Sequence, residues 1–115
     1  MNTTVRLLLA SQAALFLAAS GVHLGVLLTG WEHRKAATAE GVIGVVLLAG
    51  LALTWSSLPG APVALAVQGF ALLGTLVGLL TIALGIGPRT GPDLVLHAIM
   101  LLLLGTGLAV TWHVA

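Results

Sequence analysis

Three residues with functional side chains recur at every fourth position of one short stretch: Arg89, Asp93 and His97. Thr90 is suited to cap a helix whose first turn holds Pro92 and Asp93, because both residue types favour a helix start. In that helix Asp93 and His97 lie one turn apart on the same face, with Arg89 just outside the helix. We therefore expect a carboxylate and an imidazole to project together from the beginning of a helix.

Other ionisable residues are placed to meet this pair: His23, Glu40 and, in a connection, His33. His23 lies about five residues inside the end of its predicted helix, and His97 about five inside the start of its own. At 1.5 Å per residue, both lie roughly 7–8 Å deep. Glu40 opens another predicted helix on the same side. The sequence thus predicts one layer that contains His23, Glu40, Asp93 and His97.

A metal site is the first hypothesis for this layer. Imidazole and carboxylate ligands suit divalent transition metals, and helical bundles hold such ions with Glu and His side chains that project inward from facing helices. We expect Zn or Fe, held by the side chains of His23, Glu40 and His97. Asp93 is either a fourth ligand or an acceptor that orients a ligating imidazole. His33 joins the ligands if the first connection folds back over the site; otherwise it belongs to a solvated loop.

Haem b is the second hypothesis, with His23 and His97 as axial ligands at matched depths. Two nearby carboxylates would repel the haem propionates, however, and few aromatic residues are present to pack the ring. Arg89 has a separate expected role at the mouth of the site. It binds an anion or a lipid phosphate there, or it pairs with Asp93.

Two further hypotheses need no cofactor. His and carboxylate side chains inside a membrane mark proton relays, so the layer also suits proton or solute transport, or an accessory subunit of a larger complex. The opposite half of the spans offers mainly neutral polar groups, of which Gln12 and Gln68 are expected to pair across helices. In the plainest alternative, the histidines merely bond the carboxylates and hold the helices together.

The elements that must position these residues follow from the composition. Of the 115 residues, 59% are hydrophobic and only 6% are charged, where about 25% charged is usual for a soluble domain. Lipid must therefore surround most of the chain. Four basic against three acidic residues give no basis for a nucleic-acid partner, and the absence of cysteine excludes disulfides and thiolate metal sites.

Four apolar stretches emerge, at residues 5–28, 39–55, 62–86 and 92–114. Each is near the ~20 residues that cross a hydrocarbon core of ~30 Å, and the first is too long for the apolar part of a signal peptide. Helices satisfy all their backbone hydrogen bonds in lipid, whereas four strands could not close a barrel. Short connections make successive helices antiparallel neighbours. We predict an all-α fold, a single domain that forms an integral membrane up-down-up-down four-helix bundle.

Basic residues set the predicted orientation of this bundle. Arg34, Lys35 and Arg89 lie in the first and third connections, whereas only Arg6 lies on the other side. The positive-inside rule then puts these two connections in the cytoplasm and both termini outside.

Paired glycines and three short segments complete the sequence evidence. Gly74 and Gly78 have the spacing that lets helices approach closely in lipid, which also suits a homodimer or a larger membrane complex. The segments 87–93 (GPRTGPD, followed by His97), 38–41 (TAEG) and 21–24 (GVHL) resemble those of small prokaryotic four-span membrane proteins. That resemblance implies an integral protein of a prokaryotic inner or plasma membrane. It implies no activity, cofactor or substrate.

Overall fold

The protein consists of four helices and no strand, in a computed structural model that describes residues 1–115. All four helices are long and apolar enough to cross a membrane. The all-α prediction is therefore confirmed. The helices are α1 (Thr3–His23), α2 (Arg34–Leu53), α3 (Gly60–Ala83) and α4 (Gly91–Val114).

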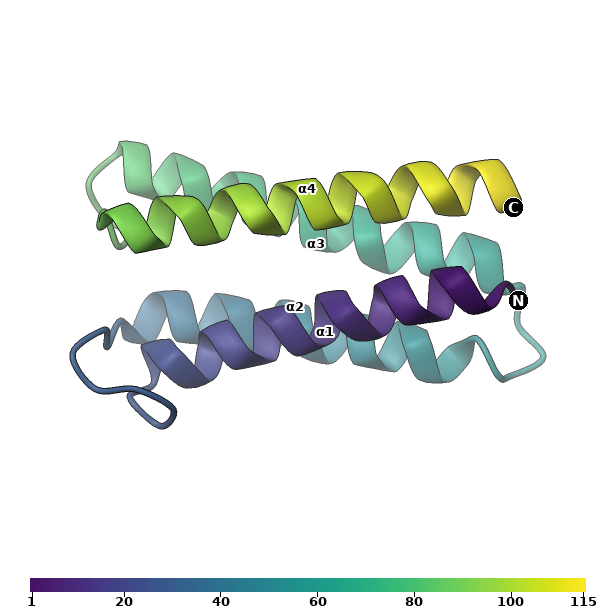
Figure 1. The fold of residues 1–115 in the computed structure, drawn as a ribbon, viewed down its shortest axis with the longest axis horizontal. Helices are drawn as coiled ribbons and strands as arrows, with labels where there is room; N and C mark the ends of the chain where they lie inside the picture. Colours follow the sequence, from purple (N-terminus) through teal and green to yellow (C-terminus); the bar gives the residue numbers. More distant parts are fainter.

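The four helices lie side by side, and their connections alternate between the two ends of the molecule (Figure 1). The α1–α2 and α3–α4 connections lie at one end, and the α2–α3 connection and both chain termini lie at the other. Each helix packs against the next along the chain, α4 closes the ring against α1, and only α1 and α3 touch across it. As a result, the end of α1, the start of α2 and the start of α4 meet at one end of the molecule.

Two of the helix starts follow from side-chain caps. The Thr90 hydroxyl accepts a hydrogen bond from the backbone N–H of Asp93, as the sequence predicts, and Pro92 lies in the first turn of α4. The α2 helix begins at Arg34, five residues before its predicted start at residue 39. Its cap is the His33 ring, whose Nδ1 accepts from the N–H of Ala36.

The first helix ends at His23, five residues before its predicted end at residue 28. Gly25 turns the chain with φ +78°, a left-handed conformation that favours glycine, and the following N–H groups bond back to carbonyls of the last helical turn. His23 is consequently the last residue of α1, rather than lying about five residues inside it. This places its ring at the end of the bundle where α2 and α4 begin.

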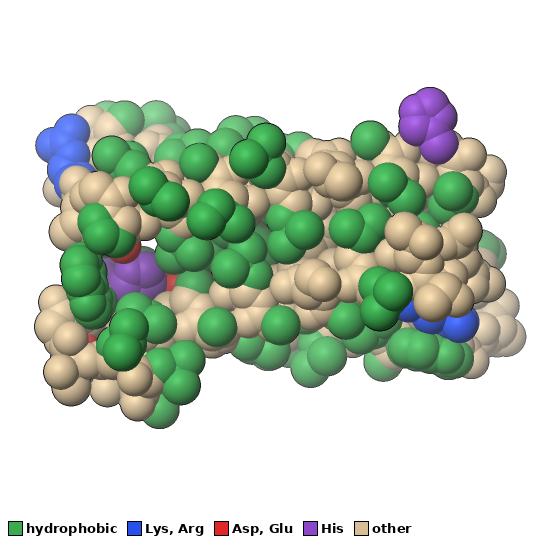
Figure 2. Space-filling model, in the orientation of Figure 1, with side chains coloured by type: hydrophobic (Ala, Val, Ile, Leu, Met, Phe, Trp, Pro, Cys, Tyr) green, Lys and Arg blue, Asp and Glu red, His purple; other side chains and the backbone are tan.

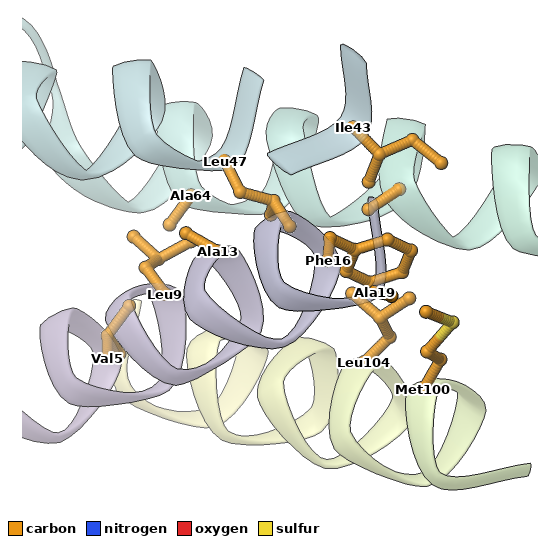
Figure 3. Packing of buried hydrophobic residues seen from close by; sticks show 11 residues of the cluster. Val5, Leu9, Ala13, Phe16, Ala19, Ile43, Leu47, Ala64, Met100 and Leu104 are labelled. Atoms are coloured by element: carbon orange, nitrogen blue, oxygen red, sulfur yellow. The ribbon is translucent and has the colours of Figure 1, made fainter. Parts of the chain in front are cut away.

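The core is an apolar column along the middle of the bundle (Figure 3). Leu9, Phe16, Leu47 and Leu104 are almost fully buried in it, and α3 adds only the small Ala64 and Ala71. Large apolar side chains also cover the outside (Figure 2). The most outward-facing on each helix include Leu7 (63% exposed), Val45 (59%), Leu73 (66%) and Leu102 (72%).

Candidate functional site

A buried histidine lies between two buried carboxylates where α1, α2 and α4 meet. His23 Nδ1 is 2.8 Å from Glu40 Oε2, and His23 Nε2 is 3.1 Å from Asp93 Oδ1. The exposed fractions are 2% for His23, 6% for Glu40 and 5% for Asp93. Three of the four residues in the predicted layer therefore form one hydrogen-bonded chain across three helices.

The hydrogen-bonded chain of Glu40, His23 and Asp93 must hold two protons. A neutral imidazole between two ionised carboxylates holds only one. An ionised carboxylate only accepts hydrogen bonds, and a neutral imidazole donates from one nitrogen only. Without the additional proton, one of the two contacts would set a nitrogen lone pair against an anionic oxygen. One added proton, on His23 or on either acid, makes both contacts hydrogen bonds. The arrangement is that of a proton-binding group that keeps one net negative charge.

Both carboxylates have a second oxygen, and the two differ. Asp93 Oδ2 accepts from the Thr90 hydroxyl, the same hydroxyl that accepts from the Asp93 backbone N–H. Asp93 is thus fixed by the helix cap that it belongs to. Glu40 Oε1, in contrast, is buried and has no hydrogen-bond partner. An unpartnered buried carboxylate oxygen is costly, and it marks a place where a donor can bind.

His97 lies beside the hydrogen-bonded chain of His23, Glu40 and Asp93. Its side chain makes no hydrogen bond to any of these three side chains. Its Nδ1 is 2.8 Å from the backbone carbonyl of Asp93 one turn earlier. Since a carbonyl only accepts, Nδ1 carries the hydrogen and the Nε2 of the neutral ring is an acceptor. That Nε2 has no hydrogen-bond partner.

His33 is used by the backbone. Its Nδ1 accepts from the Ala36 N–H at 3.2 Å, so its Nε2 carries the hydrogen and donates to the carbonyl of Ile86 at 3.3 Å. The backbone N–H of His33 also donates to the carbonyl of His23 at 2.8 Å. His33 therefore caps α2 and ties the two connections together, and neither ring nitrogen is free to act as a ligand.

Arg89 does not pair with Asp93, contrary to one of its two predicted roles. The only close contacts between basic and acidic side chains are the two made by His23. The Asp93 oxygens bond to His23 and Thr90 instead, and the Arg89 guanidinium lies beside Gly85. Binding of an anion or a lipid phosphate by Arg89 stays a prediction.

Two openings reach the buried chain from opposite sides. A cavity of about 160 Å³ has Glu40 and His97 in its wall, together with residues of α3. A wider cleft of about 370 Å³ lies between α1 and α4 and has His23 and Asp93 in its wall. Figure 2 shows imidazole and carboxylate atoms through an opening on the α1–α4 side of the molecule.

A second polar layer lies farther along the bundle. The Gln12 amide donates to Gln68 Oε1 at 2.9 Å, and the Gln68 amide donates to Thr111 Oγ1 at 2.9 Å. The predicted pairing of the two glutamines is thus present, and Thr111 extends it to α4. Apolar side chains of the core, including those of Phe16 and Leu104, separate this layer from the histidine chain.

Two features of the polar contacts were not anticipated from the sequence. Arg6 donates to the Thr54 hydroxyl at 3.1 Å and to the Thr54 carbonyl at 2.8 Å, and its guanidinium lies 4.3 Å from the centre of the Trp55 ring. It thereby donates to the carbonyl and hydroxyl of Thr54 at the end of α2, a pairing of residues 48 positions apart that the sequence does not indicate. The sequence also does not indicate that Glu40 Oε1 lacks a partner, because this depends on which of the two carboxylate oxygens bonds to His23.

No three His, Asp or Glu side chains are arranged to hold a metal ion together. Metal binding through His23, Glu40, His97 and Asp93, and haem binding through the two histidines, stay predictions.

Comparison with family models, with curated proteins and with solved structures finds no match to this chain.

Proposed function

We propose that the protein is an integral membrane up-down-up-down four-helix bundle that binds and relays a proton, as a component of a membrane transport system. Four helices of sufficient length and apolarity, with connections that alternate between two ends, support the membrane bundle. Large apolar side chains on the outside of every helix support lipid as its surroundings.

The orientation proposed is that of the positive-inside rule. Arg34, Lys35 and Arg89 belong to the end that holds the histidine chain, which we place toward the cytoplasm. The exposed rings of Trp55 and Trp112 belong to the other end, where interfacial aromatics would meet lipid headgroups. The proton-binding chain then lies near the cytoplasmic face.

The observation that carries the proposal is the contact of each His23 ring nitrogen with a carboxylate. An imidazole with partners on both nitrogens can accept a proton at one and release it at the other. A proton on Glu40 Oε2 can pass to Nδ1, and the proton on Nε2 can pass to Asp93 Oδ1. The Thr90 hydroxyl donates to the other oxygen of Asp93 and holds this carboxylate in place. His and carboxylate chains of this kind are the usual parts of membrane proton relays.

The relay that we propose joins two openings. One is the cavity between α2 and α3, with Glu40 and His97 in its wall, and the other is the cleft between α1 and α4. Glu40 lies in the wall of the cavity and Asp93 in the wall of the cleft. The apolar core and the amide layer beyond it contain no ionisable group that would extend the chain through the bundle. Proton binding at one face, and not uncoupled conduction across the membrane, is therefore the function supported.

Nitrogen-15 NMR of histidine-labelled protein in nanodiscs tests the proposal. We expect both His23 nitrogens to report hydrogen bonding, with the Nδ1 signal displaced by Glu40→Gln and the Nε2 signal displaced by Asp93→Asn. His23→Gln assigns the two signals, and Glu32→Gln, which alters an exposed acid in the first connection, is the matched control. A His23 ring with one nitrogen free, insensitive to both substitutions, would refute the relay.

Metal and haem binding carry a specific cost in this geometry. A metal or haem iron that bonds His23 must first displace Glu40 or Asp93 from a ring nitrogen, since both are engaged. The displaced carboxylate would then have to become a ligand itself or lose its only imidazole contact. These two hypotheses consequently rank behind the relay.

A further inference from the structure

The wall of the cavity between α2 and α3 contains two hydrogen-bond acceptors. Glu40 Oε1 is buried without a partner, and Nε2 of a neutral His97 ring is an acceptor, because Nδ1 donates to the carbonyl of Asp93. The Thr75 and Thr81 hydroxyls also line the cavity, but they donate to carbonyls of their own helix at 2.8 and 2.7 Å. With a neutral His97 ring, the wall thus offers two acceptors that have no partner within the protein and that a bound donor would satisfy.

The charge around these acceptors is negative. Glu40 and Asp93 are both buried, and their only contacts with basic side chains are the two made by His23. Even with His23 doubly protonated, one negative charge is left uncompensated. The other ionisable groups that line the cavity are His97, His33 and the exposed Lys35. His33 is held by two backbone groups, and Lys35 begins α2 at the end of the bundle and pairs with neither acid.

Apolar side chains line the part of the cavity that lies against the core, and the cavity as a whole has the size of a single ring. Phe16, Ile43 and Met100 form one side of it, near one another in the core (Figure 3). Gly74 and Gly78 line the α3 side, where the side chains of Ile43 and His97 pack against them. Its volume of about 160 Å³ is close to that of an engineered cavity of ~150 Å³ that holds benzene.

We propose that this cavity binds a small protonated amine with an apolar body of about one ring. The ammonium group donates to Glu40 Oε1 and to His97 Nε2 and compensates the buried negative charge. The apolar body packs against Phe16, Ile43 and Met100. The site shares Glu40 with the relay proposed above, but amine binding does not depend on proton transfer.

Four ring compounds of nearly equal size test the charge and donor requirements: benzylamine, benzyl alcohol, benzoate and toluene. Binding to the purified full chain is measured by ligand-detected NMR in nanodiscs. We expect benzylamine, as its ammonium ion, to bind about tenfold or more tightly than the neutral compounds, and benzoate to bind most weakly. Equal affinity of benzylamine and toluene would overturn the proposal, as would a preference for benzoate.

Glu40→Gln is expected to weaken benzylamine binding about tenfold and to leave toluene binding nearly unchanged. Glu32→Gln, the exposed control, is expected to change neither. Where Glu40→Gln does not fold, the wild-type protein still decides: benzylamine must displace the nitrogen-15 signal of His97 Nε2, and toluene must not. Benzylamine binding without the His23 signature described above would refute the relay and leave the amine site standing. The His23 signature without preferential benzylamine binding would refute the amine site and leave the relay standing.

Discussion

Gly78 faces the free nitrogen of His97: a methyl group at position 78 would lie 3.2 Å from His97 Nε2. Gly74, one turn earlier, faces α2 instead, where a methyl group would lie 2.7 Å from Ile43 Cδ1. The two glycines of this motif therefore act differently. Gly74 lets α3 approach α2, as expected for close helix packing, whereas Gly78 leaves room for an imidazole beside the cavity.

Gly78→Ala is expected to lower benzylamine affinity several-fold, because the added methyl crowds the acceptor that the ammonium uses. Gly105→Ala is the matched control, since a methyl there meets no atom within 4 Å. It should leave affinity unchanged and raise the free energy of unfolding by roughly 0.5–1 kcal/mol, the usual gain for replacing a helical glycine. Ligand titration and reversible unfolding in detergent provide the two measurements. Equal affinities in all three proteins would contradict the assigned role of Gly78.

His23→Ala is expected to destabilise the bundle strongly. It leaves two buried carboxylates without the imidazole between them, and removal of one partner of a buried ion pair costs about 3–5 kcal/mol. The same substitution in a Glu40→Gln, Asp93→Asn background should cost much less, since the remaining amides are neutral. Unfolding free energies of the four proteins form a cycle. A cost for His23→Ala that is the same in both backgrounds would show that the three side chains are not coupled.

The sequence predicts the meeting of His23, Glu40 and Asp93 because depth along each helix determines which residues share a level. Alternating helix directions then bring the end of α1 to the starts of α2 and α4. The partners of each atom could not be predicted in this way. They depend on the rotation of every helix about its own axis, and helices that are apolar on all sides carry little periodic signal of that rotation.

Local chemistry explains the other differences. A ring nitrogen of His33 caps α2, whereas the familiar capping signals are Ser, Thr, Asp and Asn, so this helix starts earlier than the sequence indicates. His97 bonds a backbone carbonyl of its own helix, a contact that spacing alone cannot distinguish from a bond to a neighbouring helix. Gly25 ends α1 early because its φ of +78° turns the chain.

Gln68→Leu is expected to lower the free energy of unfolding by about 1–2 kcal/mol, because it removes interhelical bonds to Gln12 and Thr111 that are worth roughly 0.6 kcal/mol each and leaves their groups unsatisfied. Benzylamine affinity and the His23 NMR signals should not change, since the apolar core separates the two polar layers. A change in either signal would mean that the layers are coupled. The same detergent unfolding and NMR measurements apply.

The proposed orientation predicts which end of the bundle can be labelled from outside the cell. The chain contains no cysteine, so single-cysteine variants give an unambiguous result. His113→Cys, near the exposed end of α4, should react with an impermeant maleimide in intact cells. Lys35→Cys, at the exposed start of α2, should react only after the cells are lysed. The opposite pattern would invert the topology, and equal reactivity of both would argue against a membrane-spanning bundle.

Metal content separates the relay from the metal hypothesis. Because both His23 nitrogens are engaged and His33 is held by backbone groups, we expect detergent-purified protein to contain little Zn or Fe. The content should be the same in wild type, His23→Ala and His97→Ala when measured by elemental analysis. Stoichiometric metal in the wild type that is lost in both variants would instead establish the two histidines as ligands. A Soret band in protein from haem-supplemented cells, absent from both variants, would establish haem ligation in the same way.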